Sequence, residues 1–212
     1  MKKKPIVGLF IHHPTCSLCC VSGTYEALAQ QYEIFPFGIN DLNDPSFVKA
    51  KMLIFPGGFG DSEKFNSIFK DHKDVILEQI DKGRKYLGIC MGAYWAGPNY
   101  FNILRNLDVV QYIKRPRADI RRPHPTVANI NWGESKYKMY FYDSAAVIGN
   151  GRCETIATYK NGDAMAIIQK NIGLIGCHPE SMRSWYDKSY LVNHWHKFHH
   201  HKLLQEFVDD LL

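Results

Sequence analysis

The sequence predicts a single α/β domain over residues 1–212, with a central, mostly parallel sheet, helices on both faces and antiparallel strands in the second half. Strand-like and helix-like patterns alternate up to about residue 90. Shorter strand-like segments with a hairpin signal follow after about residue 125. The 212 residues, of which 45% are hydrophobic, suit one core, and no linker separates the halves.

The first half predicts four buried strands and two helices. The strands are the apolar runs "PIVGLFI", "YEIFPF", "KMLIFPGG" and "KYLGIC". One helix is expected over residues 22–32, capped by Ser22 or Thr24, with Tyr25, Leu28 and Tyr32 on one face. Residues 67–83 predict a second helix that stops at Gly83.

The second half predicts shorter, antiparallel strands. They are the segments "TVANINW", "KYKMYFYD", "ETIATYKNGDAMAIIQ" and "NIGLIG". The Asn161-Gly162 pair indicates a tight hairpin turn. Residues 189–212 predict an amphipathic C-terminal helix, and the side chains expected to face the body are Trp195, Phe198, Leu203, Phe207 and Leu211.

Composition limits the classes of function. The apolar run that starts at Ile6 is too short for a secretory signal, and no segment has the roughly 20 apolar residues that a membrane helix needs. We therefore expect a cytoplasmic protein with reduced cysteines and no membrane partner. The net charge of +5 includes a basic run at residues 114–122. We interpret this run as a solvated loop and expect no nucleic-acid partner; binding there would fall steeply with salt.

The stretch "KYLGICMGAYWAG" places Cys90 between a strand and a helix. A sharp turn at this point presents the side chain at the carboxyl end of the sheet, where open α/β folds bind ligands. Such a turn explains Gly88 and Gly92, which lie two residues before and two residues after Cys90, because a side chain at either position would obstruct it. A thiol beside the unpaired N–H groups of a helix N-terminus is a candidate nucleophile, although a buried structural cysteine is the plainer alternative.

Two further stretches supply the groups that such a nucleophile needs. "LIFPGGFGD" ends a strand in Gly57 and Gly58, where the Gly58 amide could form an oxyanion hole with the amide of Met91. "IGLIGCHPES" delivers His178 and Glu180 at the end of another strand. Residues two apart on an extended segment face the same way, so the Glu180 carboxylate could orient the His178 ring as a general base.

Taken together, "GICMGAY", "FPGGFGD" and "HPES" resemble the class I glutamine amidotransferase-like superfamily. Within it, the chain resembles in particular the biotin-protein ligase N-terminal domain family, with its early cysteine-rich loop and a tryptophan, here Trp185, after the "HPE" motif. The resemblance runs from about Ile6 to Asp187. It implies a flavodoxin-like three-layer sandwich and a catalytic triad of Cys90, His178 and Glu180. An intracellular-protease-like branch shares the elbow cysteine, but the His-x-Glu spacing favours the amidotransferases.

One position departs from the pattern of glutamine-hydrolysing members, which read G-x-C-x-G-x-Q. Tyr94 stands where that glutamine helps to bind substrate. The chain also shows no glycine- and arginine-rich biotin/ATP loop, so we expect no biotin chemistry and no cofactor. The expected substrate is a small amide, with a partner chain as a potential acceptor of ammonia or the acyl group. The alternative is a catalytically idle module that binds a small ligand or a partner protein.

Two histidine- and cysteine-rich segments remain. The loop from His12 to Cys20 should line the same end of the sheet, so Cys16 and Cys19, with Gly57 and Tyr94, are candidate substrate-pocket residues. It lacks the second ligand pair of a zinc signature, and we expect no metal. In the last helix, His196 and His200 are four apart and could hold a metal, but a solvated polar face is the plainer interpretation.

Overall fold

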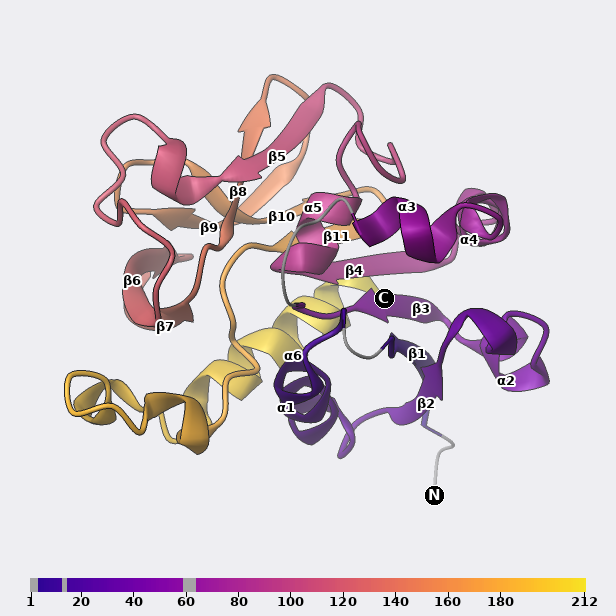
Figure 1. The fold of residues 1–212 in the computed structure, drawn as a ribbon, viewed down its shortest axis with the longest axis horizontal. Coiled ribbons are helices and arrows are strands. Elements are labelled where there is room, and N and C mark those ends of the chain that lie inside the picture. Colours follow the sequence, from indigo (N-terminus) through magenta and orange to yellow (C-terminus); the bar gives the residue numbers. More distant parts are fainter. Residues whose placement is uncertain (1–3, 13–14, 59–63) are drawn as a thin grey trace.

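The computed structural model describes residues 4–12, 15–58 and 64–212, and within them one sheet of 11 strands. Its first half is parallel (Figure 1). In order across the sheet, the parallel strands are β2 (Glu33–Phe37), β1 (Ile6–Phe10), β3 (Met52–Phe55), β4 (Lys85–Ile89) and β11 (Ile172–Ile175). The four strands predicted in the first half are therefore confirmed.

Antiparallel strands continue the sheet beyond β11. They are β10 (Ala164–Gln169), β9 (Glu154–Tyr159), β6 (Thr126–Trp132) and β7 (Ser135–Phe141), with β8 (Ala145–Gly149) and β5 (Leu107–Gln111) paired alongside. The predicted turn joins β9 to β10, and Gly162 has a φ of 92°, which favours glycine. The α/β fold with a parallel first half and an antiparallel second half is confirmed. Strands β5 and β8 were not predicted. The segment "NIGLIG" was expected among the antiparallel strands, but as β11 it pairs in parallel with β4 and antiparallel with β10.

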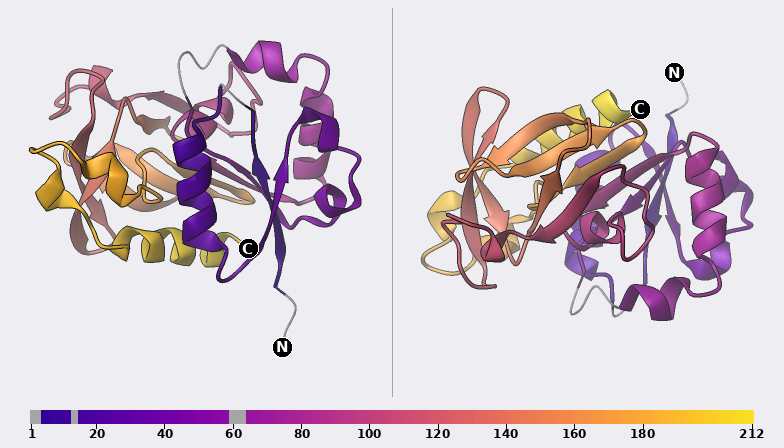
Figure 2. Two further views of the ribbon diagram at one scale, coloured as in Figure 1. Left: turned by 60° about the horizontal axis from the view of Figure 1, so that its bottom comes forward. Right: turned by 90° about the horizontal axis from the view of Figure 1, so that it is seen from above.

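Helices cover both faces of the parallel half. They are α1 (Leu18–Leu28), α2 (Pro45–Lys49), α3 (Lys64–Phe69), α4 (Lys73–Asp81), α5 (Met91–Trp95) and α6 (His199–Leu211). Helices α1 and α6 lie together on one side, and α2, α3 and α4 lie on the other (Figures 1 and 2). On this second side, the aromatic rings of Phe10, Phe55, Phe69 and Trp95 pack against one another in a core with no solvent exposure. This packing holds the carboxyl ends of β1, β3 and β4 together.

Two helix predictions from the first half need correction. Helix α1 begins at Leu18, because the Ser17 side chain accepts the amide of Cys20, whereas Thr24 lies inside the helix and donates to the Cys20 carbonyl. Tyr25 is consequently 52% exposed. The single helix expected over residues 67–83 is two, α3 and α4, because His72 (φ −129°) interrupts the helical geometry.

The C-terminal helix is shorter than the expected 189–212. Short 3-10 turns occupy residues 183–186 and 192–194, and α6 begins only at His199. Lys197 and Phe198 have φ values of 47° and 68°, and left-handed residues cannot continue a right-handed helix. Phe198 is therefore 49% exposed instead of facing the body, while Leu203, Phe207 and Leu211 are buried as predicted.

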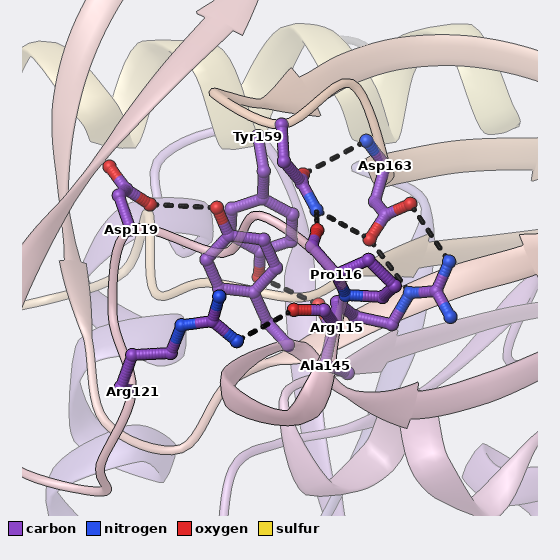
Figure 3. A network of polar contacts seen from close by, with 9 residues as sticks. Arg115, Pro116, Asp119, Arg121, Ala145, Tyr159 and Asp163 are labelled. Carbon is purple, nitrogen blue, oxygen red and sulfur yellow. Dashed lines mark hydrogen bonds and ion pairs between the residues drawn. The ribbon is translucent and has the colours of Figure 1, made fainter.

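Part of the basic run at residues 114–122 makes internal contacts. The Arg115 guanidinium binds the Asp163 carboxylate at 2.8 Å, and Arg121 donates to the Arg115 carbonyl (Figure 3). The Tyr112 hydroxyl donates to the Asp119 carboxylate nearby. These contacts tie the segment after β5 to the turn between β9 and β10. Arg117 and Arg122 remain exposed, as expected of a solvated loop.

No helix in the described parts of the chain is long and apolar enough to cross a membrane.

Candidate functional site

Cys90 occupies a strained turn between β4 and α5. Its φ of 51° and ψ of −103° lie outside the helical and extended regions that non-glycine residues favour. A Cβ on Gly88 would lie 2.4 Å from the Gly92 carbonyl oxygen, and one on Gly92 would lie 1.9 Å from the Phe55 carbonyl oxygen. Both glycines are therefore required for the turn, as the sequence predicted.

The turn brings the Cys90 thiol close to the His178 ring, and the two side chains interact electrostatically. His178 follows β11, the neighbour of β4 in the sheet, and the Cys90 amide donates to the Ile175 carbonyl at 2.9 Å. On the other side of the ring, Nδ1 and Glu180 Oε1 are 2.8 Å apart. A thiol, an imidazole and a carboxylate are thus brought together, and the imidazole and the carboxylate are hydrogen-bonded.

This chain of groups is largely removed from solvent. Cys90 is 8% exposed, His178 4% and Glu180 0%. The rings of Tyr140 and Trp185 contact the His178 imidazole edge to face, with ring centres 6.0 and 5.4 Å away. The imidazole is therefore held in one orientation by aromatic packing as well as by the carboxylate.

Charges at the site favour a protonated imidazole. Burial lowers the pKa of His178, but interactions with Cys90, Glu180 and Cys20 outweigh burial and raise the pKa well above its ordinary value. A ring with a raised pKa can retain a proton beside a thiolate and later deliver it to a leaving group.

The glycine turn after β3 lies against the same groups. A Cβ on Gly57 would lie 2.7 Å from Cys20 Sγ and 2.9 Å from His178 Cε1. A Cβ on Gly58 would overlap the end of the Met91 side chain, at 1.5 Å, so Gly58 and Met91 are neighbours. An isolated β-bridge pairs Cys16 with Gly58. Its hydrogen bond runs from the Ser17 amide to the Gly57 carbonyl, 3.1 Å apart, and does not use the Gly58 amide.

Cys20 contacts the site and was not singled out from the sequence. It lies in the first turn of α1, is 5% exposed, and its sulfur lies within 4.8 Å of a ligand atom of His178. Burial raises the pKa of the Cys20 thiol above its ordinary value, although its interaction with His178 opposes this shift. Helix α1 can come this close because a Cβ on Gly23 would be only 2.3 Å from the Glu180 carbonyl oxygen.

The structure does not bring all of the predicted pocket residues to the Cys90, His178 and Glu180 side chains. Cys19 is exposed on α1, whereas its neighbour Cys20 faces the imidazole. Cys16 is buried beside Cys20, and burial raises its pKa to about 12. Tyr94 is half-buried near Cys90, and its hydroxyl donates to the Asp143 carbonyl at 3.3 Å. Residues 13–14 of the His12–Cys20 loop, and residues 59–61 of "FPGGFGD", lie outside the described residues.

Three of the five histidines near the C-terminus are buried and do not lie on a solvated face. His196, His200 and His201 are 8%, 3% and 4% exposed, and the rings of His196 and His200 stack 4.1 Å apart. His196 Nε2 and His201 Nε2 lie 3.1 and 3.3 Å from the carbonyl oxygen of Ser181, the residue after Glu180. The expectation of a polar face was wrong because α6 begins late and turns these rings inward.

These buried histidines predict acid-sensitive folding. Burial lowers the pKa of His196 to about 3 and of His200 to about 4, whereas unfolded histidine titrates near 6.5. The unfolded chain therefore binds more protons below about pH 6.5, and each histidine should cost up to about 1.4 kcal/mol of stability per pH unit between its two pKa values. Above about pH 6.5 this contribution should be flat. Chemical denaturation measured from pH 7.5 down to pH 4.5 tests this.

The variant His200→Phe identifies the source of the acid sensitivity. It keeps a flat ring but cannot take up a proton, so its stability should fall less steeply with pH than that of the unmodified chain. The half-exposed His194→Gln is the matched control and should leave the slope unchanged. Equal slopes for all three chains would contradict the assignment.

Comparisons with known proteins agree with the fold and with the motifs. Residues 13–111 match the family model described as biotin-protein ligase, N terminal. No curated protein matches the chain in sequence. Among solved structures, a glutamine amidotransferase from Thermotoga maritima has a TM-score of 0.70 at 11% identity, covering 99% of both chains. PurLQS from the same organism has a TM-score of 0.66 at 15% identity, with 99% of this chain and 100% of that chain covered.

Another glutamine amidotransferase structure has a TM-score of 0.65 at 14% identity and covers 96% of this chain and 97% of that one. At these identities, the similarity establishes the fold alone. The resemblance stated from the sequence is confirmed to this extent: residues 13–111 match the biotin-protein ligase N-terminal family, and the fold is that of glutamine amidotransferase structures.

Proposed function

Because the chain has the glutamine amidotransferase-like fold and matches the biotin-protein ligase N-terminal family over residues 13–111, we propose that it is a cysteine-nucleophile hydrolase or amidotransferase acting on a small amide. The observation that carries the proposal is the grouping of the Cys90 thiol, the His178 ring and the Glu180 carboxylate, in which the ring and the carboxylate are hydrogen-bonded. A nucleophile, a base and a group that orients the base are what acyl transfer requires.

In the proposed reaction, Cys90 Sγ attacks the amide carbon and forms a carbon–sulfur bond. The His178 ring takes up the thiol proton and delivers it to the departing nitrogen as the carbon–nitrogen bond breaks. The product is a thioester and ammonia or an amine. Water, or an amine held by a partner chain, then attacks the thioester, and the sulfur leaves with its proton restored through His178.

The remaining groups stabilise charge. Glu180 holds the proton of Nδ1 and favours the imidazolium that forms when the thiol loses its proton. The amides of Gly58 and Met91 are the proposed oxyanion donors, because the two residues adjoin each other and Met91 is the first residue of α5, where an amide has no helical partner. Losing one such donor typically costs about 3–4 kcal/mol of transition-state stabilisation.

Measuring ammonia release from glutamine and from a panel of small amides tests the proposal. The unmodified chain should release ammonia, and Cys90→Ala should reduce release to background. Cys153→Ala, which removes a half-buried thiol outside the site, should not change the rate. In parallel, an electrophilic glutamine analogue should label the unmodified chain at Cys90. Equal labelling or turnover of Cys90→Ala, or neither labelling nor turnover of the unmodified chain, would count against the proposal.

A second candidate function is a catalytically idle module that binds a small ligand or a partner protein. Two observations favour it: Tyr94 replaces the substrate-binding glutamine, and Cys90 is only 8% exposed. This candidate predicts that small amides bind without being hydrolysed, and that Cys90→Ala binds them as tightly as the unmodified chain does.

A further inference from the structure

A second set of donor atoms converges on the His178 ring. One atom each from Cys20, His178 and Glu180 lie within 4.8 Å of one another. Thiolate sulfur, imidazole nitrogen and carboxylate oxygen are the three kinds of protein ligand that zinc accepts. In a tetrahedral zinc site with bonds of about 2.0–2.3 Å, neighbouring ligand atoms are about 3.3–3.8 Å apart. The three side chains could reach that geometry with shifts of about 1 Å.

The cluster has unused capacity to bind a cation. Glu180 is fully buried, and its second carboxylate oxygen, Oε2, has no hydrogen-bond partner within the described parts of the chain. A buried carboxylate oxygen without a partner is energetically costly. The hydrogen bond between Oε1 and Nδ1 does not use Oε2. A metal ion between the carboxylate and the Cys20 sulfur would satisfy it.

We propose that Cys20, His178 and Glu180 form a binding site for Zn²⁺ that overlaps the candidate catalytic site. Binding forms a zinc–sulfur bond to Cys20, and the thiol proton passes to water. The ring binds through a nitrogen lone pair, and any proton on that nitrogen also passes to water. Three protein ligands leave the fourth tetrahedral position open, as in zinc sites that exchange ligands.

The donor set selects against the abundant hard cations. Mg²⁺ requires nearly octahedral oxygen coordination, and Ca²⁺ takes six to eight oxygen ligands, whereas this cluster offers a single carboxylate. Sulfur and nitrogen ligands favour Zn²⁺ and its neighbours among the transition metals.

Zinc at this site would act as an inhibitor; this consequence, unlike the binding itself, rests on the proposed function. The ion would occupy the imidazole and the carboxylate that are needed to take up the proton of Cys90.

Calorimetric titration of the reduced, metal-free full chain with ZnCl₂ tests the proposal without any substrate. We expect one zinc per chain and no binding of MgCl₂. Zinc binding should be at least about 10-fold weaker in Cys20→Ser, since even a residue that only hydrogen-bonds a metal ligand typically contributes about 10-fold to metal affinity. Cys19→Ser, the exposed neighbour on the same helix, is the matched control and should bind like the unmodified chain. Titration with CoCl₂ should produce thiolate-to-cobalt absorption that Cys20→Ser loses.

Further variants separate this site from other sources of binding. His200→Phe should leave zinc affinity unchanged, which distinguishes the site from the buried histidines of α6. Circular dichroism verifies that Cys20→Ser is folded, and Cys20→Ala replaces it if it is not. Absence of zinc binding, or equal affinity in the unmodified chain and the Cys20 variants, would overturn the proposal. Zinc binding by a chain that hydrolyses no amide would leave the zinc site standing and remove the proposed function instead.

Discussion

Replacing Glu180 by glutamine is expected to slow amide hydrolysis by about 10²- to 10⁴-fold while leaving the fold intact. The glutamine side chain has nearly the shape of the Glu180 carboxylate. It carries no charge, however, to stabilise the imidazolium that forms in the proposed reaction when Cys90 loses its proton. Its NH₂ group can also donate to His178 Nδ1, which would hold the ring in the wrong tautomer. Because Glu180 is fully buried and 2.8 Å from the ring, solvent cannot substitute for it.

The effect should appear in kcat and in the pH profile. The negative charge of Glu180 contributes to the raised pKa of His178, so the variant should lose its protonated imidazole at a lower pH. Glu206→Gln, which neutralises an exposed carboxylate on α6, is the matched control and should change neither quantity. If Glu180→Gln hydrolysed amides at the unmodified rate, Glu180 would have no part in the proposed reaction.

Replacing Gly92 by alanine is expected to destabilise the chain by more than about 3 kcal/mol or to prevent folding. The new Cβ would lie 1.9 Å from the Phe55 carbonyl oxygen, a backbone atom that cannot rotate away. Relief would require α5 to move away from β3, where Phe55 and Trp95 pack in the fully buried aromatic core. Overpacking a core typically costs about 1–3 kcal/mol, and a forced backbone shift adds to that.

Urea denaturation compares Gly92→Ala with a matched substitution, Gly38→Ala. At Gly38, the nearest atom to an added Cβ is 3.4 Å away, and the φ of −118° suits alanine. This control should therefore change stability by less than about 1 kcal/mol. Comparable stabilities for the two variants would mean that the turn at Cys90 does not depend on close contact between α5 and β3.

Local patterns were sufficient to predict four of the five parallel strands, β1 to β4, and the turn at Cys90. Apolar runs of strand length, ending in glycines, left few alternatives for residues 5–90. The His178-x-Glu180 spacing likewise placed both side chains on one face of an extended segment, and the structure has them 2.8 Å apart. These features depend only on the geometry of a few consecutive residues.

Helix boundaries were predicted less well because competing residues can act as caps. Ser17, Ser22 and Thr24 all carry a hydroxyl near the start of α1, and only the contacts of the folded chain select Ser17. The break at His72 and the left-handed conformation of Phe198 have no glycine or proline to announce them.

The sequence by itself was enough to locate the first four strands, the cysteine at the strand–helix turn and the histidine–carboxylate pair, because each of these features is encoded within a short segment. Packing between distant segments decided the rest. On α1, Cys20 and not Cys19 lies beside the imidazole, on a helix whose Gly23 packs closely against the Glu180 carbonyl. The histidines of α6 are buried for the same reason: which face of a helix meets the core depends on its neighbours as well as on its own sequence.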